Sequence, residues 1–454
     1  MRSRINLILL TVAVCATACA REEVKRDFRK FANLPVGRSV RIESQFGRIS
    51  VRTKPGREVF VQALTHCSAD TMDQAKRICD QIQVLFEETP TGVSVRTEYP
   101  RLSGRFHNLS YAVDYDITMP DTAPLDVRNR FGKLDVVDLH APATIDSGNG
   151  TVTFIGGRGQ QRIGNSFGMV ELRKNEGDVS INNTNGPTIA SDINGGLDLA
   201  NRFGEIRVTN VARGVTIHSN NSNIEVTGAG GPTMITNSFG RTTVSDVKSN
   251  VTVQSQNGEI DADGIAGTAE LHTSFATIRF SRIGKSVTVK ANNSLVRGDT
   301  VGESATVETS FAGVDVRGVK GAARVTGGNA YIKLAAIGGE AYAKTTFAPV
   351  NVSDVAGPVT VEGQNSAVTV VGRSAEKCQP ISLRTTFSPI RVTLPEGQGY
   401  NVTAHTTFGH IHTAPAVVTT VSGDVGGSGL TGKINGGGCD LKLIGQNGNI
   451  DILR

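Results

Sequence analysis

The feature that most constrains this chain is a repeat of 36 residues. Phenylalanine followed by a small residue recurs at this interval, and asparagine followed by a small residue recurs midway between successive phenylalanines. The unit is therefore half of this interval, about 18 residues, with the two residue types alternating at one position, which we number 0. The series comprises Phe131, Asn149, Phe167, Asn185, Phe203, Asn221, Phe239, Asn257, Phe275, Asn293, Phe311, Asn329, Phe347 and Asn365.

Apolar residues recur within each unit at positions +3, +5, +12 and +14, and often at +8. In the unit that begins at Phe311 they include Val314, Val316 and Val319. Pairs spaced by two residues alternate as a β-strand does, and glycine, asparagine and aspartate between the pairs mark turns. Short strands at a fixed period predict an all-β fold, a parallel β-solenoid whose coils bury their apolar rows only by stacking.

Two coil lengths fit this period. A coil of about 18 residues places phenylalanine and asparagine alternately in one column, whereas a coil of twice that length gives each type its own column. We expect the shorter coil, because about six small inward side chains suit a slim core at normal packing density. We also expect both residue types to point inward, with the asparagines forming a buried amide ladder rather than a ligand-binding row. The small residue at +1 is explained by a steric collision at a tight corner more readily than by glycine-like backbone angles.

The first twenty residues have the layout of a secretory signal peptide. Arg2 and Arg4 precede an apolar run over residues 5–14, which is shorter than the stretch of about 20 residues that a membrane-spanning helix needs. Cleavage after Ala20 is one alternative. The other is a bacterial lipoprotein box at Ala16-Thr17-Ala18-Cys19, although Ala16 stands where leucine is usual. In that case Cys19 carries the lipid.

The cysteines favour lipidation. Cys15 is removed with the signal peptide, and the sequence predicts disulfides Cys67–Cys79 and Cys378–Cys439, which suit an oxidising compartment. Cys19 is then left without a partner, as a lipidated cysteine is. We therefore predict an exported cell-envelope protein, periplasmic or surface-facing, that is held to a membrane by a lipid on Cys19.

The chain divides into five predicted segments. Residues 1–20 form the signal peptide, and the charged residues 21–34 are expected to form a solvated tether. Residues 35–130 are expected to form a small α+β capping domain with one helix over about 71–86. Residues 131–394 form the regular solenoid, and residues 395–454 form irregular C-terminal coils and a cap. Caps are needed because the open edge of a terminal coil would pair with other chains.

Charge and motifs point away from several functions. The chain carries 47 Lys and Arg against 42 Asp and Glu, an excess too small to indicate nucleic-acid binding. There is no phosphate-binding loop, nucleophile elbow or zinc-protease helix, so no cofactor is expected. His405, His410 and His412 are close in sequence, but they read as exposed strand residues rather than as a metal site. The carboxylates that an acidic-polysaccharide-cleaving solenoid would use are scattered in sequence: Asp135, Glu171, Glu225, Glu259 and Asp261.

The repeated segments QFGRISV, RFGEIRV and QNGEIDA, together with the signal peptide and a strand-rich leader, resemble a bacterial envelope family. That family is described as adhesin-like β-strand-repeat proteins of unknown function. The resemblance covers roughly residues 35–454. It implies the solenoid fold and an adhesin-like role, and it brings no catalytic residues with it.

These observations predict a non-enzymatic envelope lipoprotein whose long side adheres to, or binds, a glycan or an envelope protein. The alternative is a polysaccharide-active enzyme of the lyase or hydrolase type. A tight exterior cluster of two or three carboxylates beside a basic residue would favour the enzyme. A smooth face of threonine, serine and asparagine would favour the binding module.

Overall fold

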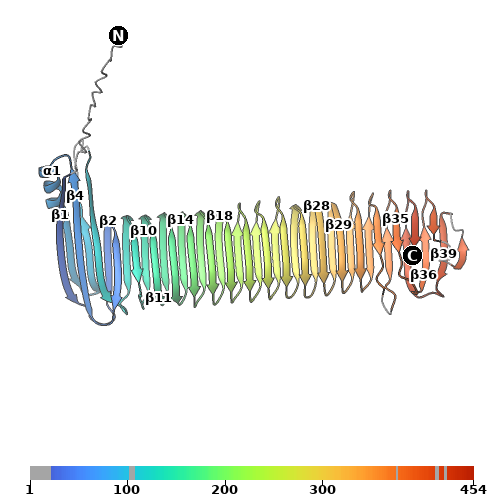
Figure 1. Cartoon of the computed structure of the whole chain (residues 1–454), viewed down its shortest axis with the longest axis horizontal. Helices are drawn as coiled ribbons and strands as arrows, with labels where there is room; N and C mark the ends of the chain where they lie inside the picture. The colour runs from blue at the N-terminus through green and yellow to red at the C-terminus, as the bar shows by residue number, and fades with distance from the viewer. Residues whose placement is uncertain (1–21, 102–107, 375–376, 415–418, 424–426) are drawn as a thin grey trace, which may run out of the picture.

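A computed structural model describes residues 22–101, 108–374, 377–414, 419–423 and 427–454. The predicted signal peptide and Cys19 lie outside these residues. The chain forms a long rod of stacked β-coils with a small cap at its N-terminal end (Figure 1). The predicted parallel β-solenoid, with coils about 18 residues apart, is confirmed.

Each coil contributes one strand to each of two parallel stacks. In one coil, β12 (Gln161–Phe167) runs to a corner and β13 (Val170–Glu176) leaves it. β12 pairs in parallel with β10 and β14, and β13 pairs with β11 and β15. Each of these pairings joins residues at equivalent positions of successive units, so the side chains at one position form a column along the rod.

The first stack contains the strands that run towards the phenylalanine and asparagine corner. In spatial order it comprises β2 (Ser39–Phe46), β8 (Leu125–Phe131), β10 (Ala143–Asn149), β12, β14 (Val179–Asn185), β16 (Leu197–Phe203), β18 (Val215–Asn221), β20 (Thr233–Asn237), β22 (Val251–Ser255), β24 (Ala269–Thr273), β26 (Val287–Asn293), the first halves of β28 (Ala305–Val319) and β29 (Ala323–Ile337), β30 (Ala341–Thr345), β32 (Val359–Gly363), β34 (Ile381–Arg384), β40 (Cys439–Ile444) and β36 (Tyr400–His405).

The second stack contains the strands that leave this corner. It comprises β3 (Ile49–Lys54), β9 (Leu134–Val137), β11 (Val152–Arg158), β13, β15 (Thr188–Ile193), β17 (Ile206–Val211), β19 (Ile224–Ala229), β21 (Thr242–Val247), β23 (Ile260–Ile265), β25 (Ile278–Ile283), β27 (Val296–Val301), the second halves of β28 and β29, β31 (Val350–Val355), β33 (Val368–Val371), β35 (Ile390–Thr393), β41 (Ile450–Leu453) and β37 (Ile411–Thr413).

The core lies between the two stacks and is filled by the predicted apolar positions. In the coil of Phe239, the side chains of Val244, Val247, Val251 and Val253 are at most 1% exposed. No aromatic bulk is needed, because stacking surrounds each small side chain with its counterparts in the coils on either side.

Phenylalanine and asparagine form a single column, as the shorter coil requires: Asn149 pairs with Phe131 on one side and with Phe167 on the other. Their predicted inward orientation is wrong. The nine phenylalanines of the column, from Phe131 to Phe408, are 42–79% exposed. The chain bends after position −2, so the alternation of the strand stops there and positions −1 and 0 both face outward.

A buried amide ladder does exist, two positions before the predicted one. At position −2 the side-chain amide of Asn183 donates to the carbonyl oxygens of Gly186 in its own coil and Gly168 in the coil before, both at 3.1 Å. Later coils use a hydroxyl, as where Thr345 donates to the carbonyl oxygen of Ala330 at 2.8 Å. The asparagines of this ladder are at most 4% exposed: Asn129, Asn165, Asn183, Asn201 and Asn237.

The small residue at +1 closes the same corner. Gly168 has φ +117°, and a Cβ there would overlap the carbonyl oxygen of Gly150, one coil away. The steric explanation therefore holds, but at these glycines the left-handed backbone is required as well.

A second corner at position +7 was not predicted. Residues there adopt positive φ in coil after coil, including Asp138 at +56°, Asn210 at +56° and Asp354 at +52°. Aspartate, asparagine and glycine tolerate this conformation best, and they fill most of the column. The sequence does carry this signal, but it becomes visible only when the units are aligned on position 0.

The N-terminal region adds one coil and then caps it. β2 and β3 pair with β8 and β9, and the rings of Phe46 and Phe131 stack with their centroids 5.4 Å apart. Between these coils the chain forms β4 (Glu58–Ala69), α1 (Met72–Gln81), β5 (Gln83–Thr89), β6 (Gly92–Glu98) and β7 (Ser110–Pro120). Helix α1 is shorter than predicted, because residues 83–89 pair with β6 instead of extending it. The disulfide Cys67–Cys79, which joins β4 to α1, is confirmed.

The prediction of a tether over residues 21–34 is wrong for the residues that the structure describes. β1 (Glu22–Asn33) pairs antiparallel with β4 along its whole length. Val24, Phe28 and Ala32 pack against the core, and Arg26 forms an ion pair with Asp80 of α1. Only four of the twelve residues of β1 are apolar, and one of them, Phe31, is exposed, so in the sequence the strand resembles a solvated segment. Its charges also protect an edge strand from pairing with other chains.

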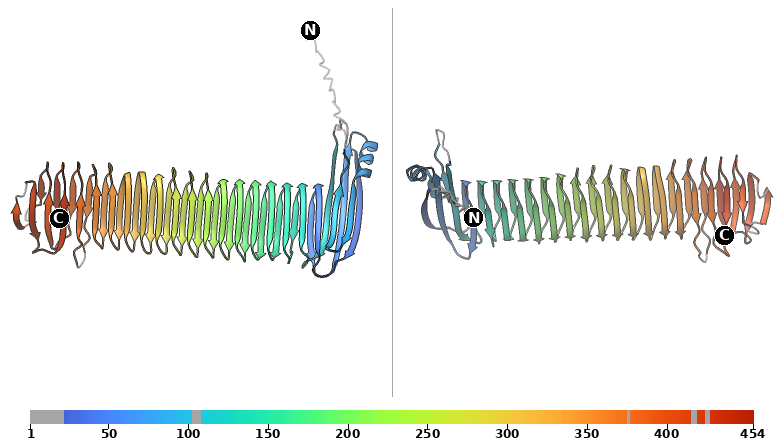
Figure 2. Two further views of the ribbon diagram at one scale, coloured as in Figure 1. Left: turned by 180° about the vertical axis from the view of Figure 1, so that it is seen from behind. Right: turned by 45° about the horizontal axis from the view of Figure 1, so that its top comes forward.

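At the C-terminal end, the order of coils in space differs from their order in the sequence. β40 and β41 lie between β34 and β35 on one side and β36 and β37 on the other. The antiparallel strands β39 (Gly429–Ile434) and β38 (Thr419–Gly423) then follow β36 (Figure 2). The predicted disulfide Cys378–Cys439 is confirmed, and it fastens the start of β40 to the segment before β34.

This insertion explains the irregular spacing of the last two phenylalanines. The backbone N–H of Asn447 donates to the carbonyl oxygen of Thr386 at 2.7 Å, and that of Phe408 donates to Gln446 at 2.6 Å. Asn447 therefore stands between Phe387 and Phe408 in the column. The alternation that seems to end in the sequence continues in space.

The buried ladder makes a direct prediction about stability. We expect Asn183→Leu to lower the free energy of unfolding by about 1–3 kcal/mol, because it removes the hydrogen bonds that a buried amide donates to the carbonyl oxygens of Gly168 and Gly186. Thermal melting of the purified chain measures the change. Asn185→Leu, two residues later on the outward corner, is the matched control and should change the free energy by less than about 0.5 kcal/mol. Equal losses in both variants would contradict the ladder.

Candidate functional site

One long edge of the rod carries no formal charge over its last nine coils. We call positions −1, 0, +1 and +2 of these coils the corner strip. In chain order it comprises residues 274–277, 292–295, 310–313, 328–331, 346–349, 364–367, 386–389, 407–410 and 446–449. These 36 positions hold no Lys, Arg, Asp or Glu, whereas the chain average of 20% charged residues would place about seven there.

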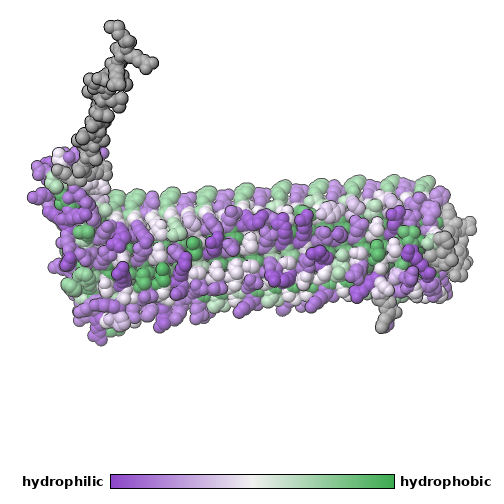
Figure 3. All heavy atoms as spheres, viewed as in Figure 1, coloured by the Kyte–Doolittle hydropathy of each residue, from purple (hydrophilic) through white to green (hydrophobic). Residues whose placement is uncertain are grey.

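Aromatic rings recur along the corner strip at every second coil. Five phenylalanines, Phe275, Phe311, Phe347, Phe387 and Phe408, are 51–79% exposed. Since adjacent parallel strands lie about 4.8 Å apart, successive rings are about 9.6 Å apart. Regularly spaced hydrophobic residues are visible along the upper edge of the rod in Figure 3. Large apolar side chains exposed at a regular spacing along one edge are unusual on a monomer and mark an interaction surface.

Amide and hydroxyl groups occupy the rest of the corner strip. Position 0 holds an asparagine between successive phenylalanines, and position −1 holds serine, threonine, asparagine or glutamine in every coil except that of Gly328. The side-chain amides of Asn292, Gln364 and Gln446 are exposed and have no hydrogen-bond partner among the residues that the structure describes. They are therefore available to a ligand as both donors and acceptors.

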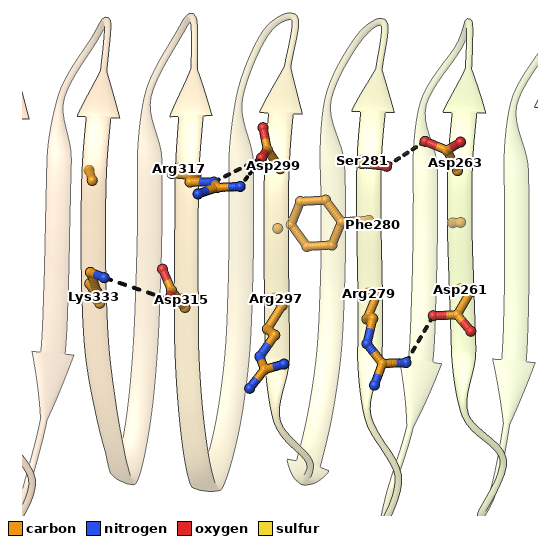
Figure 4. Close-up of a pocket in the computed structure, with 13 residues that line it drawn as sticks. Asp261, Asp263, Arg279, Phe280, Ser281, Arg297, Asp299, Asp315, Arg317 and Lys333 are labelled. Carbon is orange, nitrogen blue, oxygen red and sulfur yellow. Dashed lines mark hydrogen bonds and ion pairs between the residues drawn. The ribbon is translucent and has the colours of Figure 1, made fainter.

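A second candidate lies on the outward face of the second stack. Positions +4 and +6 form two rows of charged residues beside a shallow groove of about 670 Å³ (Figure 4). Asp261, Arg279, Arg297, Asp315 and Lys333 form the +4 row. Beneath the rows, the ring of Phe280 fills the space that a Cβ at Gly298 would occupy.

Most of the charged side chains in these two rows form ion pairs with one another or with neighbouring residues. The carboxylates of Glu259 and Asp261, which looked scattered in the sequence, share the guanidinium of Arg279, with 3.2 Å between Arg279 Nη1 and Asp261 Oδ1. Arg317 Nη2 lies 2.7 Å from Asp299 Oδ2. Arg297 makes no ion pair with any residue in the described part of the chain. The other carboxylates named in the sequence, Asp135, Glu171 and Glu225, lie in the column of Asp261 but in separate coils.

The arginines hold nearby carboxyl groups in their ionised form. The hydrogen bond from Arg282 lowers the pKa of Asp263 below its usual value, and the Thr300 hydroxyl and Arg317 do the same for Asp299. Burial alone would raise the pKa of Glu259, but hydrogen bonds from Arg279 and Arg241 outweigh it and the pKa is lowered. A carboxyl that protonates a leaving group needs a raised pKa, so these three groups are poorly suited to general acid catalysis at neutral pH.

The histidines near the C-terminus do not converge. His412 lies on β37 and His410 immediately precedes this strand, and their ring centroids are 6.2 Å apart. His412 Nδ1 lies 3.3 Å from Asp451 Oδ1. Within the described ranges, no three His, Cys, Asp or Glu residues are arranged to hold a metal ion. Over the same ranges, no helix is long and apolar enough to cross a membrane.

Comparisons with known proteins identify no family for this chain. No protein-family model matches the sequence, and no curated protein matches it. Among solved structures, a "putative cell adhesion protein" from Clostridium sporogenes aligns over 94% of this chain and 99% of its own, at 8% identity and a TM-score of 0.17. A TM-score of 0.17 is too low to indicate a common fold.

The charged face predicts a pH-dependent contribution to stability. Because Arg282 lowers the pKa of Asp263 in the folded chain, their pair stabilises the fold above the usual aspartate pKa of about 3.9. This contribution is lost as the pH falls through the lowered folded value. We therefore expect Arg282→Gln to lower the melting temperature at pH 7, and to match the wild type in strongly acidic solution.

Calorimetry over a pH series measures this difference. Arg297→Gln is the control, since Arg297 has no acidic partner among the described residues, and its melting temperature should follow the wild type throughout. An Arg282→Gln variant that melts like the wild type at pH 7 would show that the pair contributes nothing.

Proposed function

We propose that this chain is an exported cell-envelope protein, anchored by a lipid on Cys19, whose solenoid is a rigid rod that binds an envelope or cell-surface component. The observation that carries the proposal is the corner strip, an uncharged edge with exposed rings at a constant spacing. Repeated folds of this kind use their long sides as extended binding surfaces. A binding surface in register over nine coils suits an extended or repetitive partner.

Export is supported by the two disulfides. Cys67–Cys79 and Cys378–Cys439 each join elements that pack against the core. Such bonds form and persist in oxidising compartments outside the cytosol.

Anchoring is supported by the remaining cysteine. Cys67, Cys79, Cys378 and Cys439 are bonded in two pairs, and Cys15 would be removed with the signal peptide, so Cys19 is the cysteine left over. Only Ala20 and Arg21 separate it from β1, so a lipid there would hold the N-terminal cap close to the membrane. The corner strip lies in the yellow to red part of the rod in Figure 1, away from that cap. An anchored rod would therefore present the strip away from the membrane.

Binding, rather than catalysis, is the activity that we propose. A polysaccharide-active enzyme would need a protonated carboxyl beside the bond to be cleaved, or a base that is free to remove a proton. The exterior carboxylates nearest to this description, Glu259, Asp263 and Asp299, are paired with arginines and have lowered pKa values. Glu259 and Asp261 beside Arg279 do form the kind of carboxylate cluster expected of an enzyme, but Arg279 pairs with both of them. The uncharged polar edge matches the feature that favours a binding module, and the proposal rests on that edge.

The anchor makes a prediction about Cys19. Full-length wild-type protein should partition into the detergent phase, because a bacterial lipoprotein cysteine carries several acyl chains and such anchoring is stable. Cys19→Ala should move the protein to the aqueous phase without changing its melting temperature. Wild-type protein that is fully aqueous and begins at Arg21 would show cleavage after Ala20 and rule out the lipid.

The binding role is tested on insoluble cell-envelope material with full-length protein in detergent. We expect the double variant Phe311→Ser/Phe347→Ser to lose most of the co-sedimentation shown by the wild type, because it removes two neighbouring rings of the strip. Phe167→Ser/Phe203→Ser is the matched control: these rings are similarly exposed in the same column but lie outside the strip. Equal sedimentation of all three proteins would contradict binding through the strip.

A further inference from the structure

We propose that the ligand of the corner strip is a neutral, linear glycan that lies along the rod. This inference rests on the proposed function and specifies the class of partner. It is carried by three properties of the strip: its lack of charge, the spacing of its rings and the amides between them.

The lack of charge selects against other polymers and surfaces. An acidic polysaccharide, a nucleic acid or an anionic membrane would be attracted by lysine and arginine, and none stands at the 36 positions of the strip. Protein interfaces are enriched in arginine at their most buried points, and the strip lacks it too. A neutral glycan needs no charged partner, because its polar groups are hydroxyls and amides.

The rings supply the apolar part of the recognition. A sugar ring has a face of C–H groups, and a phenylalanine ring offers a flat apolar surface of similar size. The rings of Phe275, Phe311 and Phe347 stand on an edge rather than in a cavity, with 51–65% of each side chain exposed. An exposed edge admits a chain of any length, whereas a cavity would select a single small molecule.

The repeat of the strip matches the repeat of a polymer. Two coils, about 9.6 Å, separate successive rings, and one asparagine lies between them. In many β-linked linear glycans successive sugars face opposite ways, so every second sugar presents the same face. One ring contact and one amide contact per pair of sugars then recur along the rod. Eight steps from Phe275 to Phe408 extend the strip over about 38 Å.

The amides are poised for hydroxyl groups. Asn329 at position 0 and Asn292 and Gln364 at position −1 are on the surface, and none has a side-chain partner within the described chain. Each offers donors and an acceptor, which is what a hydroxyl requires. Position −2 of their own coils is Ala291, Gly327 or Gly363, and the −2 hydroxyl of the next coil binds the corner backbone instead. Thr309 donates to the carbonyl oxygen of Asn292 at 3.1 Å, Thr345 to that of Gly328 at 3.2 Å and Thr385 to that of Ser366 at 2.8 Å. The backbone that carries these amides is therefore held in place before the ligand arrives.

The experiment measures binding of full-length protein in detergent to defined oligosaccharides by calorimetry. The neutral probes are linear β-linked hexasaccharides of glucose, mannose, xylose and N-acetylglucosamine, and the acidic probe is polygalacturonate. We expect at least one neutral hexasaccharide to bind, with little dependence on salt. We also expect its disaccharide to bind at least about tenfold more weakly, because a disaccharide reaches only one ring.

Variants separate the strip from the rest of the rod. Phe311→Ser/Phe347→Ser should weaken hexasaccharide binding at least about tenfold, and Phe167→Ser/Phe203→Ser should leave it unchanged. The inference is overturned if only polygalacturonate binds, if no neutral probe binds, or if binding is equal in both variants. Strip-dependent binding to envelope material without any neutral glycan would leave the proposed function standing and refute the glycan. Loss of strip dependence in both assays would refute both.

Discussion

The backbone hydrogen bonds between coils are the interaction on which this structure depends. Each coil meets the next at the same offset in sequence through most of the rod, as where Gly168 N–H donates to Asn185 O at 2.8 Å and Val170 N–H to Pro187 O at 3.0 Å. A fixed offset turns every position into a column, so one residue choice acts along the whole rod. No coil buries its apolar row alone, and the ends therefore need caps, which β1 and the antiparallel strands β38 and β39 provide.

The corner at position 0 shows how the core determines the surface. In most coils position −2 closes the core with an amide or a hydroxyl, as where Asn183 and Thr345 donate to corner carbonyl oxygens, and the small residue at +1 lies against the preceding coil. Nothing larger fits inside, so the residue at position 0 is turned outward. Alternating phenylalanine with asparagine there separates the exposed rings by amides and avoids an unbroken apolar edge, which would favour aggregation.

The C-terminal coil is inserted into the stack and contributes one position to the proposed binding edge. The last coil is inserted between two earlier ones and places Asn447 between Phe387 and Phe408, which keeps ring and amide in alternation. The disulfide Cys378–Cys439 fastens this coil at the point where it enters the stack. The C-terminal cap and the far end of the corner strip are therefore one structural unit.

The sequence by itself determined the period, the length of the coil and the buried apolar positions, because strand alternation and repeat length are local properties. Both disulfide pairs followed as well, because the four cysteines form two groups near opposite ends of the chain. Prediction from the sequence failed where the orientation of a side chain depends on a bend in the backbone, or where a strand depends on a partner far away in the chain. The outward turn of Phe131 and its column depends on where the corner lies, and the strand β1 depends on pairing with β4. The insertion of β40 and the sharing of Arg279 by Glu259 and Asp261 likewise join segments whose contact no local pattern records. The charge-free strip was present in the sequence as separate tetrapeptides, and only the stacking of coils made it a surface.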